Sequence, residues 1–348
     1  MTHRVVQWTT GNVGKQSAQA IARHPELELV GCYAWSPEKI GRDVGEICGT
    51  DPLGVTATDD VAALLALQPD CVLYSPMWPA VDELVRILES GVDVVTTAAF
   101  ITGSHLGPER RKLTDACERG GATLFGTGVS PGFVDMLGLV MAGISDRIDK
   151  VTVSEAAHTM GYDSPETEKP AGFGRPIDDP KLQAMTAQGT AVFGEAVEMM
   201  ADALGVELDE IACEAEYAAA LEDLDLGSWR IGKGCVAGIA ASWQGRVRGR
   251  SVVELNIRWK KAAVLEPDWK ISDGWVVEVA GRPTVRTTVQ FLPPPDFAAT
   301  SLADFMVLGH IMTAMPAVNA IPAVVAAPPG IASYADLSLP VPRGLVRI

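Results

Sequence analysis

The sequence predicts an α/β protein whose first part is a parallel sheet and whose second part is an α+β domain with a mixed or antiparallel sheet. Three observations support this. Short apolar runs alternate with helical patterns from residue 1 to about 140, and the first run ends in a glycine-containing turn. Beyond this region the apolar runs give way to strands that alternate apolar and polar residues. We therefore expect one domain at residues 1–145, a second at 146–300 and a C-terminal segment at 301–348.

The elements of the first part follow from these apolar runs. Five predicted strands span residues 5–8, 29–35, 71–75, 92–97 and 123–126. A helical stretch at 16–23 follows the first of them directly. The clearest helix spans 82–90, because Leu84, Val85 and Leu88 share one face and Gly91 stops the helix.

The second part has a different pattern. Residues 180–204 form one long helix candidate, and residues 151–157 form a strand. Residues 251–260 alternate strictly, with the apolar side carrying Val253, Leu255, Ile257 and Trp259 and the polar side Glu254, Asn256, Arg258 and Lys260. Residues 285–291 alternate likewise. Such alternation is typical of half-buried antiparallel strands.

The turn after the first strand fits most of the G-x-G-x-x-G pattern of dinucleotide-binding folds. Gly11 and Gly14 match, whereas Thr9 stands where the first glycine belongs. Glycines here let the backbone approach a pyrophosphate, which the N–H groups at the helix start then bind. The strand–turn–helix context is the one that the pattern requires. We therefore predict a Rossmann-type domain with cofactor contacts from Thr10, Gly11, Asn12, Val13 and Gly14.

Two other interpretations of this turn remain. The first is an ordinary tight β–α turn, which needs glycine for the same steric reason. A phosphate loop of the nucleotide-hydrolase type is disfavoured, because Lys15 is followed by Gln16 and not by the Ser or Thr that holds magnesium.

The end of the second strand favours NADP over NAD as the cofactor. NAD-specific folds place an acidic residue about 20 positions after the glycines. Here that region offers Ser36, Lys39 and Arg42, which could hold a 2′-phosphate. Glu38 opposes this interpretation, and NAD remains possible. The alternative for Lys39 and Arg42 is a solvated loop.

Small, turn-forming residues follow three further strands of the first part. Because ligands collect at the carboxyl ends of parallel strands, we expect them to complete the cofactor site. They are Ser75, Pro76, Thr97, Ser130, Pro131 and Gly132. Any one of these segments alone would be read as a loop.

Three residues of the second part are candidates for catalysis: Glu155, His158 and Tyr162. They could donate the proton that a reduced carbonyl or imine needs, with Thr97 and Ser130 as donors to a developing oxyanion. If the strand at 151–157 extended through 158, Glu155 and His158 would face opposite ways. No His, Asp or Glu pair has metal-ligand spacing, so we expect no metal.

The composition limits the partners. A formal net charge of −16 argues against nucleic acid or an anionic membrane surface. The six cysteines are scattered without C-x-x-C spacing, as in reduced thiols of a cytoplasmic protein. The longest apolar tract, residues 314–327, is interrupted by Pro316 and Pro322, so we expect no membrane span.

Together these motifs resemble the dihydrodipicolinate reductase-like oxidoreductases. They are most similar to the branch of the 2,4-diaminopentanoate dehydrogenases and native amine dehydrogenases. The matching pieces are residues 5–14, 39–45, 126–133 and 319–324, so the resemblance covers nearly the whole chain. It implies a Rossmann domain, a mixed-sheet second domain, NAD(P)H, commonly a homodimer, and a C-terminal segment that packs back on the first domain.

Two departures from the family patterns bear on the reaction. The five histidines include no adjacent pair, unlike true dihydrodipicolinate reductases. The related amine dehydrogenases place a glutamate shortly after the fifth strand, where this chain has Ala98 and Ala99 and no carboxylate until Glu109. That segment is apolar, as are Trp78 and Phe133, which suits a hydrophobic substrate.

These observations predict an NAD(P)H-dependent oxidoreductase that reduces a C=O or C=N bond of a small, largely apolar substrate. It would resemble an amine dehydrogenase without the expected glutamate. The alternative is a non-catalytic protein that binds NADP(H) and senses redox state.

Overall fold

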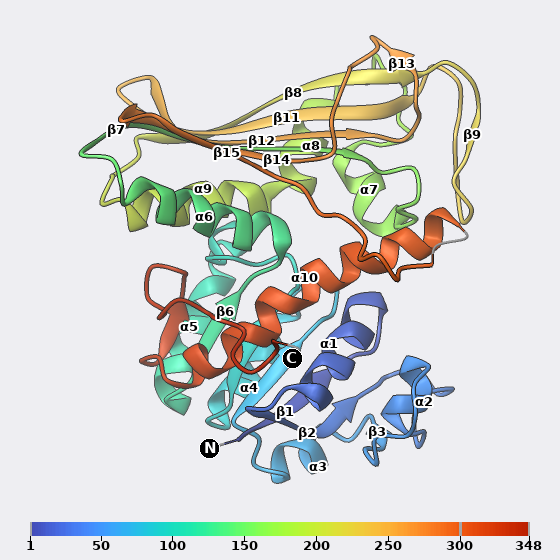
Figure 1. The fold of residues 1–348 in the computed structure, drawn as a ribbon, viewed down its shortest axis with the longest axis vertical. Helices are drawn as coiled ribbons and strands as arrows, with labels where there is room; N and C mark the ends of the chain where they lie inside the picture. Colours follow the sequence, from blue (N-terminus) through green and yellow to red (C-terminus); the bar gives the residue numbers. More distant parts are fainter. Residues whose placement is uncertain (1, 299–300, 347–348) are drawn as a thin grey trace. The chain divides into compact units, whose positions relative to one another are not determined.

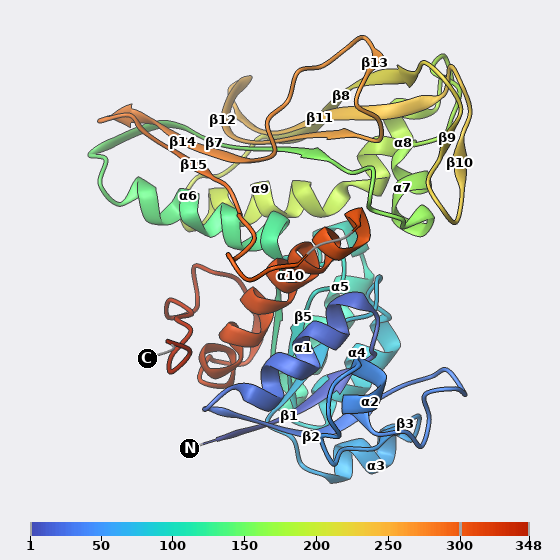
Figure 2. The same cartoon turned by 45° about the vertical axis from the view of Figure 1, so that its right-hand side comes forward.

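The computed structural model describes residues 2–298 and 301–346. The chain forms two units, which are drawn in Figures 1 and 2. Unit 1 comprises Met1–Phe133 and Val307–Ile348, and unit 2 comprises Val134–Met306. Unit 1 is therefore built from both ends of the chain.

Unit 1 contains a seven-stranded sheet in the order β16-β6-β5-β4-β1-β2-β3. Every neighbouring pair is parallel. The strands are β1 (His3–Trp8), β2 (Leu27–Tyr33), β3 (Ala57–Thr58), β4 (Cys71–Tyr74), β5 (Asp93–Thr96), β6 (Thr123–Gly126) and β16 (Gly330–Ala332). The strand order reverses at β1, which lies between β2 and β4. Ligands of doubly wound sheets bind at such a reversal.

Helices cover both faces of this sheet, which confirms the predicted α/β class. They are α1 (Asn12–Arg23), α2 (Val44–Cys48), α3 (Val61–Ala66), α4 (Val81–Glu89), α5 (Glu109–Gly120) and α10 (Leu302–Val325), with short turns η1 (Ser104–Leu106) and η2 (Val129–Phe133). Helices α1 and α10 share one apolar cluster with the sheet, and α4 and α5 share the other. Both faces of the parallel strands are thus buried, so these strands read as continuous apolar runs.

The five strands expected in the first part all form, with ends that differ by one or two residues. The expected helices at 16–23 and 82–90 correspond to α1 and α4. Gly91 adopts a φ of 82° just after α4, the left-handed conformation that ends helices.

The expected interruption of the C-terminal apolar tract by proline was wrong. Helix α10 continues through both Pro316 and Pro322. Each proline removes one backbone donor, but burial of Ala317, Ile321 and Val324 in the core of unit 1 holds the surrounding turns. The stretch Asp304–Val325 has the length and apolar composition that would suffice to cross a membrane, yet its second half forms part of this core.

Unit 2 contains a second seven-stranded sheet, in the order β13-β8-β11-β12-β7-β14-β15. Its strands are β7 (Arg147–His158), β8 (Glu210–Ala220), β11 (Val236–Val247), β12 (Arg250–Lys260), β13 (Leu265–Glu266), β14 (Gly274–Arg282) and β15 (Val285–Val289). A separate two-stranded ribbon pairs β9 (Leu224–Asp225) with β10 (Arg230–Ile231). Strands β7 and β12 are parallel and the other neighbours are antiparallel, so the second sheet is mixed, one of the two kinds that the sequence predicts.

The helices of unit 2 are α6 (Val134–Ala142), α7 (Pro165–Ala171), α8 (Leu182–Gly189) and α9 (Ala191–Ala203). Helices α6 and α9 lie against the same side of the sheet (Figure 2). The single helix expected over residues 180–204 is therefore two helices that meet at Thr190. The Thr190 hydroxyl bonds the Thr186 carbonyl and accepts the Trp243 indole N–H at 3.0 Å, which fixes the break.

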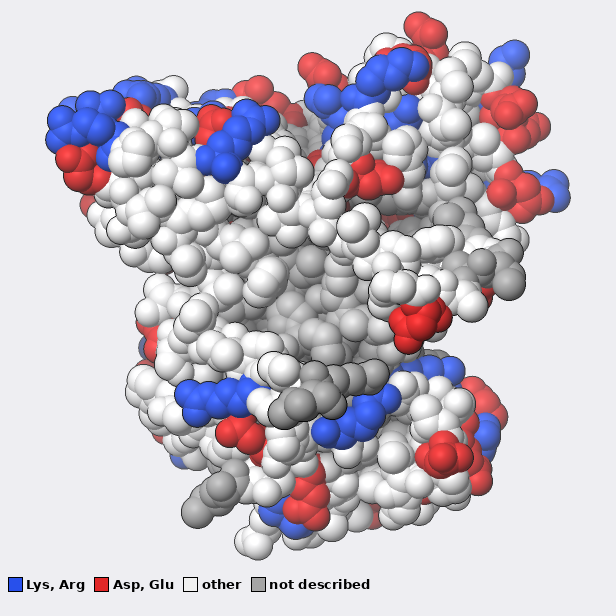
Figure 3. All heavy atoms as spheres, in the orientation of Figure 1, with Lys and Arg blue, Asp and Glu red and all other residues white. Residues whose placement is uncertain are grey.

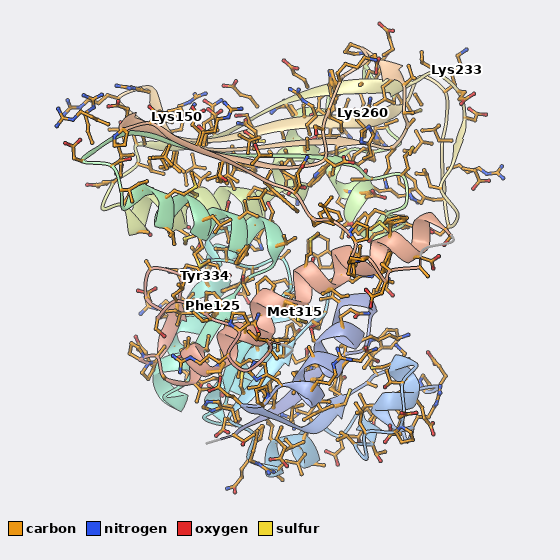
Figure 4. The ribbon with its side chains drawn as sticks, in the orientation of Figure 1. Phe125, Lys150, Lys233, Lys260, Met315 and Tyr334 are labelled. Carbon is orange, nitrogen blue, oxygen red and sulfur yellow. The ribbon has the colours of Figure 1, made fainter. Side chains whose placement is uncertain are left out.

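The alternation predicted for residues 251–260 is present in β12, with one exception. Val253, Leu255 and Ile257 are buried, as expected. Lys260 was expected among the polar, outward residues but is 2% exposed, because its ammonium is bonded by the carbonyl oxygens of Ala263 and Trp269. Figure 4 labels Lys260 and Lys150 on the strands of this sheet.

Acidic and basic side chains are interspersed on the face shown in Figure 3. Ion pairs between surface side chains include Arg282 with Asp146 and Arg119 with Glu89.

Candidate active site

The predicted cofactor residues lie at one edge of the unit 1 sheet. Trp8 pairs with Tyr33 and Tyr74, and Thr96 pairs with Tyr74 and Gly126, so the five strands end in register. Because the strands are parallel, the loops that follow them leave the same edge. The residues in these loops are Thr10, Gly11, Asn12, Val13, Gly14, Ser36, Lys39, Arg42, Ser75, Pro76, Thr97, Ser130, Pro131 and Gly132.

The turn between β1 and α1 has the backbone shape of a glycine turn despite its threonine. Thr9 adopts a φ of 69°, a conformation that glycine adopts readily and a β-branched residue rarely does. Its N–H donates to the Tyr33 carbonyl at 3.0 Å, and its own carbonyl accepts from the Gln7 amide at 3.0 Å. Thr9 thus takes the place of the missing first glycine.

Gly11 and Gly14 are needed for different reasons. A Cβ atom on Gly14 would lie 2.4 Å from the Thr9 carbonyl oxygen, so only glycine fits that position. A Cβ atom on Gly11 would meet no protein atom within 4 Å. Gly11 caps α1 without a side-chain hydrogen bond, so no capping side chain occupies the first amides of the helix. This is the arrangement that binds a pyrophosphate.

The loop after β2 holds its candidate groups close to the glycine turn. Lys39 Nζ donates to the Thr10 carbonyl at 3.1 Å. Ser36 is buried. Hydrogen bonds from the Glu38 backbone N–H and from the Ser36 hydroxyl lower the pKa of the Glu38 carboxyl. Arg42 is exposed. A lysine and an arginine therefore lie at this edge, beside one carboxylate.

The loops after β4 and β5 are joined to each other and to the glycine turn. The Ser75 hydroxyl accepts from the Gln7 amide at 3.2 Å. The Thr97 N–H donates to the Tyr74 carbonyl at 3.0 Å, and the Ala99 N–H to the Met77 carbonyl at 3.2 Å. These bonds hold the loops in fixed positions relative to the sheet edge.

The loop after β6 is packed against the C-terminal segment. Gly132 has a φ of 134°, and a Cβ there would lie 2.8 Å from Thr127 Oγ1. That same oxygen lies 2.6 Å from the Tyr334 hydroxyl. The Tyr334 ring meets Phe125 edge-on at 5.1 Å, and Figure 4 shows the two side by side. Tyr334 therefore supports the segment that carries Ser130 and Pro131.

Glu155 of unit 2 is held by hydrogen bonds to both of its carboxylate oxygens. It lies on β7, between β12 and β14. The Trp259 indole N–H donates to its Oε1 at 2.7 Å, and the Trp275 indole N–H to its Oε2 at 2.9 Å. Glu155 shares a side of β7 with Val151 and Val153, which are buried beneath the helices, and is itself partly exposed.

His158 faces the other side of the sheet. Strand β7 extends through residue 158, so Glu155 and His158 point in opposite directions. Asp273 Oδ1 lies 2.9 Å from His158 Nδ1 and also accepts the His158 backbone N–H at 2.7 Å. The two candidates therefore do not act on the same face of unit 2.

Tyr162 lies in the segment between β7 and α7, which Lys261 holds in place. The buried Lys261 ammonium donates to the carbonyls of Thr159 and Tyr162 and pairs with Glu168. It lies 5.6 Å from the centre of the Tyr162 ring. Burial raises the pKa of Glu168 to about 7 and lowers the pKa of Lys261.

No carboxylate occupies the loop after β5. Ala98 is buried and Ala99 partly so. The next acidic residue, Glu109, begins α5 and pairs with Lys112 at 2.7 Å. Within residues 2–298 and 301–346, no group of three His, Cys, Asp or Glu side chains is arranged to hold a metal ion.

Sequence reasoning missed four groups of this region: the indoles of Trp259 and Trp275, the Lys261–Glu168 pair and the Tyr334 hydroxyl. Trp259 was visible as an apolar-side residue of an alternating strand. What the alternation could not show is that β12 and β14 both flank β7. The adjacent lysines Lys260 and Lys261, at the end of β12, were the signal in the sequence for a buried cation.

Two sequence families match the chain. The family described as the N-terminus of dihydrodipicolinate reductase matches residues 5–104. The family described as the 2,4-diaminopentanoate dehydrogenase C-terminal domain matches residues 133–347, more than half of the chain. The two matches follow each other along the sequence.

Individual proteins are also similar. An amine dehydrogenase of Streptomyces virginiae is 34% identical, and the alignment covers 96% of each chain. A 2,4-diaminopentanoate dehydrogenase of Acetoanaerobium sticklandii is 27% identical, with 77% of this chain and 72% of the relative covered. A solved structure of an amine dehydrogenase from Mycobacterium smegmatis superposes with a TM-score of 0.76 over 98% of this chain and 97% of that chain, at 23% identity. The last similarity shows a shared fold.

Proposed function

Because this chain belongs to the family of the 2,4-diaminopentanoate dehydrogenases and amine dehydrogenases, and is an NAD(P)-dependent dehydrogenase, we propose that it reduces a C=N or C=O bond of a small, largely apolar substrate with NADP(H). The observation that carries this proposal is the turn between β1 and α1. A Cβ on Gly11 would meet no protein atom within 4 Å, and the helix that begins there has no side-chain cap. In Rossmann folds a dinucleotide pyrophosphate binds to a bare helix start of this kind.

The preference for NADP rests on the loop after β2. No carboxylate ends that strand, and Lys39 and Arg42 stand where a 2′-phosphate needs cationic donors. Lys39 also reaches the Thr10 carbonyl, so its charge lies beside the glycine turn. Glu38, which already bonds Ser36, weakens the preference without removing it.

An apolar substrate fits the side chains exposed at the same edge. Met77, Trp78 and Phe133 are 42%, 45% and 37% exposed, although they are large and apolar. Clusters of exposed apolar side chains mark binding surfaces. Ala98 and Ala99 add no charge to the loop after β5.

The chemistry divides between the bound cofactor and the residues of the chain. When bound, the reduced dinucleotide supplies a hydride to the substrate carbon. Unit 1 orients it through the glycine turn and the loops after β4, β5 and β6. The candidates for the polar group that meets the substrate's oxygen or nitrogen are Glu155, His158 and Tyr162. Thr97 and Ser130 are candidate donors to a developing negative charge.

The test is NADPH oxidation by the purified protein with a panel of small aliphatic ketones, aldehydes and cyclic imines, each with and without ammonium. We expect turnover with at least one member, followed as loss of absorbance at 340 nm. Replacing Glu155 by Met, His158 by Leu and Tyr162 by Phe should show one dominant loss of kcat of about 10²–10⁴. NADPH affinity should persist in all three variants.

Two results would count against the proposal. NADPH binding without oxidation by any carbonyl or imine would favour the redox-sensor alternative. Near-native turnover in all three variants would show that none of the three residues supplies the polar group that the reaction needs.

A further inference from the structure

We infer that Glu155, Trp259 and Trp275 form a subsite for a positively charged nitrogen, an iminium or primary ammonium group of the substrate. This rests on the proposed function, because it identifies the group of the substrate that unit 2 recognises. It also assigns a role to a carboxylate on β7, far in the sequence from the loop after β5.

The two indoles fix the carboxylate but leave it able to bind more donors. A carboxylate has about four lone-pair positions. Trp259 and Trp275 each use one, at 2.7 and 2.9 Å, on different oxygens. The remaining positions can accept the N–H groups of a ligand. Glu155 is partly exposed, so a ligand can reach it.

The charge of Glu155 is not compensated by the protein. Both of its side-chain partners are neutral indoles, and among the described residues no Lys, Arg or His forms an ion pair with it. Other carboxylates of the same sheet have cationic partners: Glu254 lies 2.7 Å from Lys150, and Glu278 lies 3.0 Å from Arg286. A partly buried carboxylate without a counter-ion favours a cationic ligand.

The surroundings of Glu155 also suit such a ligand. Phe193 meets the Trp259 ring at 5.9 Å, and Phe291 lies 6.4 Å from the Trp275 ring. Trp275 is 7% exposed. Aromatic surroundings exclude water and attract cations through their ring faces. An alkyl group attached to the nitrogen would meet apolar surface.

The reaction has a step in which this charge matters. Condensation of ammonia with the carbonyl substrate forms a C=N bond and releases water, and protonated nitrogen carries one positive charge. When the new C–H bond forms at carbon, the π electron pair moves to nitrogen and leaves a neutral amine. No proton donor is needed in that step. Glu155 would therefore stabilise the iminium and hold the neutral product less tightly.

Binding can be measured apart from turnover. The probe is butylammonium chloride, with butan-1-ol as the uncharged match, titrated by calorimetry without dinucleotide. We expect the wild-type protein to bind butylammonium at least about tenfold more tightly than butan-1-ol, a difference of about 1.4 kcal/mol. Glu155→Gln should abolish that preference. The Trp259→Phe, Trp275→Phe double variant keeps the rings but loses both N–H donors, and should weaken butylammonium binding several-fold.

Glu254→Gln is the matched control. Glu254 lies on the same sheet but on its opposite side and already pairs with Lys150, so this variant should bind butylammonium as the wild type does. Equal binding of butylammonium by Glu155→Gln and wild type, with circular dichroism showing both folded, would overturn the inference.

Different results would contradict the nitrogen subsite and the proposed function. A protein that oxidises NADPH with ketones but shows no preference for butylammonium contradicts the nitrogen subsite and leaves the proposed function intact. A protein that binds butylammonium through Glu155 but never oxidises NADPH contradicts the proposed function.

Discussion

Gly11 and Gly14 lie in the same turn, but their replacement should have different consequences. Gly11→Val places its side chain in open space, so we expect the fold to persist and NADPH binding to be lost. Gly14→Ala places a Cβ 2.4 Å from the Thr9 carbonyl, so we expect a loss of about 1–3 kcal/mol in unfolding free energy. Thermal unfolding and fluorescence titration with NADPH measure both. A folded Gly11→Val protein with unchanged NADPH affinity would rule out this turn as the cofactor site.

Lys39 and Arg42 should contribute differently to cofactor selection. Arg42→Ala removes an exposed cation that only a 2′-phosphate would engage, so NADPH affinity should fall about tenfold and NADH affinity should stay. Lys39→Ala also removes the bond to the Thr10 carbonyl, so we expect both affinities to fall. The double variant should lose the preference for NADPH. Tighter binding of NADH than NADPH by the wild type would contradict this account.

Some site residues could be predicted from sequence because the interactions that place them are local. The glycine turn is one, since strand, turn and helix follow one another within a few residues. The sequence predicted Glu155 as a candidate residue but did not predict its hydrogen-bond partners. Its partners Trp259 and Trp275 lie 104 and 120 positions away, and only the strand order brings them together.

Among the elements, the junction of α8 and α9 depends on one hydroxyl. Thr190→Val keeps the shape of the side chain but leaves the buried Trp243 indole N–H without its acceptor. We expect unfolding free energy to fall by about 1–3 kcal/mol. Thr114→Val on α5, whose hydroxyl bonds the carbonyl four residues earlier at a solvent-exposed position, should change it by less than about 0.5 kcal/mol. Equal effects in urea denaturation would show that the junction does not depend on Thr190.

Strand β5 begins with a carboxyl group that makes stability depend on pH. Burial raises the pKa of Asp93 from 3.8 to about 6, although its Oδ1 accepts the Thr123 N–H at 2.7 Å. The folded state thus binds the proton more tightly than the unfolded state. The contribution of protonated Asp93 to the free energy of unfolding is therefore present in full below pH 3.8 and is lost as pH rises through about 6.

Asp93→Asn keeps the acceptor and removes the titration. We expect the variant to match the wild type near pH 4 and to be more stable by on the order of 1–2 kcal/mol at pH 7. Thermal or urea unfolding at both pH values measures the difference. A difference that is constant across this range, or that shrinks as pH rises, would contradict the sign of the effect.

Helix ends and breaks show where sequence rules reach their limit. Gly91 ended α4 as predicted, because the left-handed conformation is a local property of glycine. Pro316 and Pro322 did not end α10, because burial of the surrounding turns in the core of unit 1 outweighs the local cost of each proline. The break at Thr190 is likewise set by a tertiary contact.

At the scale of the molecule, sequence pattern predicted the two kinds of sheet. Continuous apolar runs indicated the parallel sheet of unit 1. Strict alternation of apolar and polar residues indicated the half-buried strands of the sheet in unit 2. The parallel pairing of β7 with β12 inside a mostly antiparallel sheet was not predictable, because alternation is the same for both pairings. The family resemblance predicted the class of enzyme, which the comparisons confirm.

The proposed function and the nitrogen subsite together predict that this dehydrogenase transfers a hydride to the carbon of a C=N bond. The most direct measurement uses NADPH carrying deuterium at the transferred position of C4, with a small aliphatic ketone and ammonium. We predict an amine product that is one mass unit heavier than the product made with ordinary NADPH, formed in amounts equal to the NADPH consumed. An alcohol as the sole labelled product would contradict the C=N assignment, and an unlabelled amine would contradict direct hydride transfer.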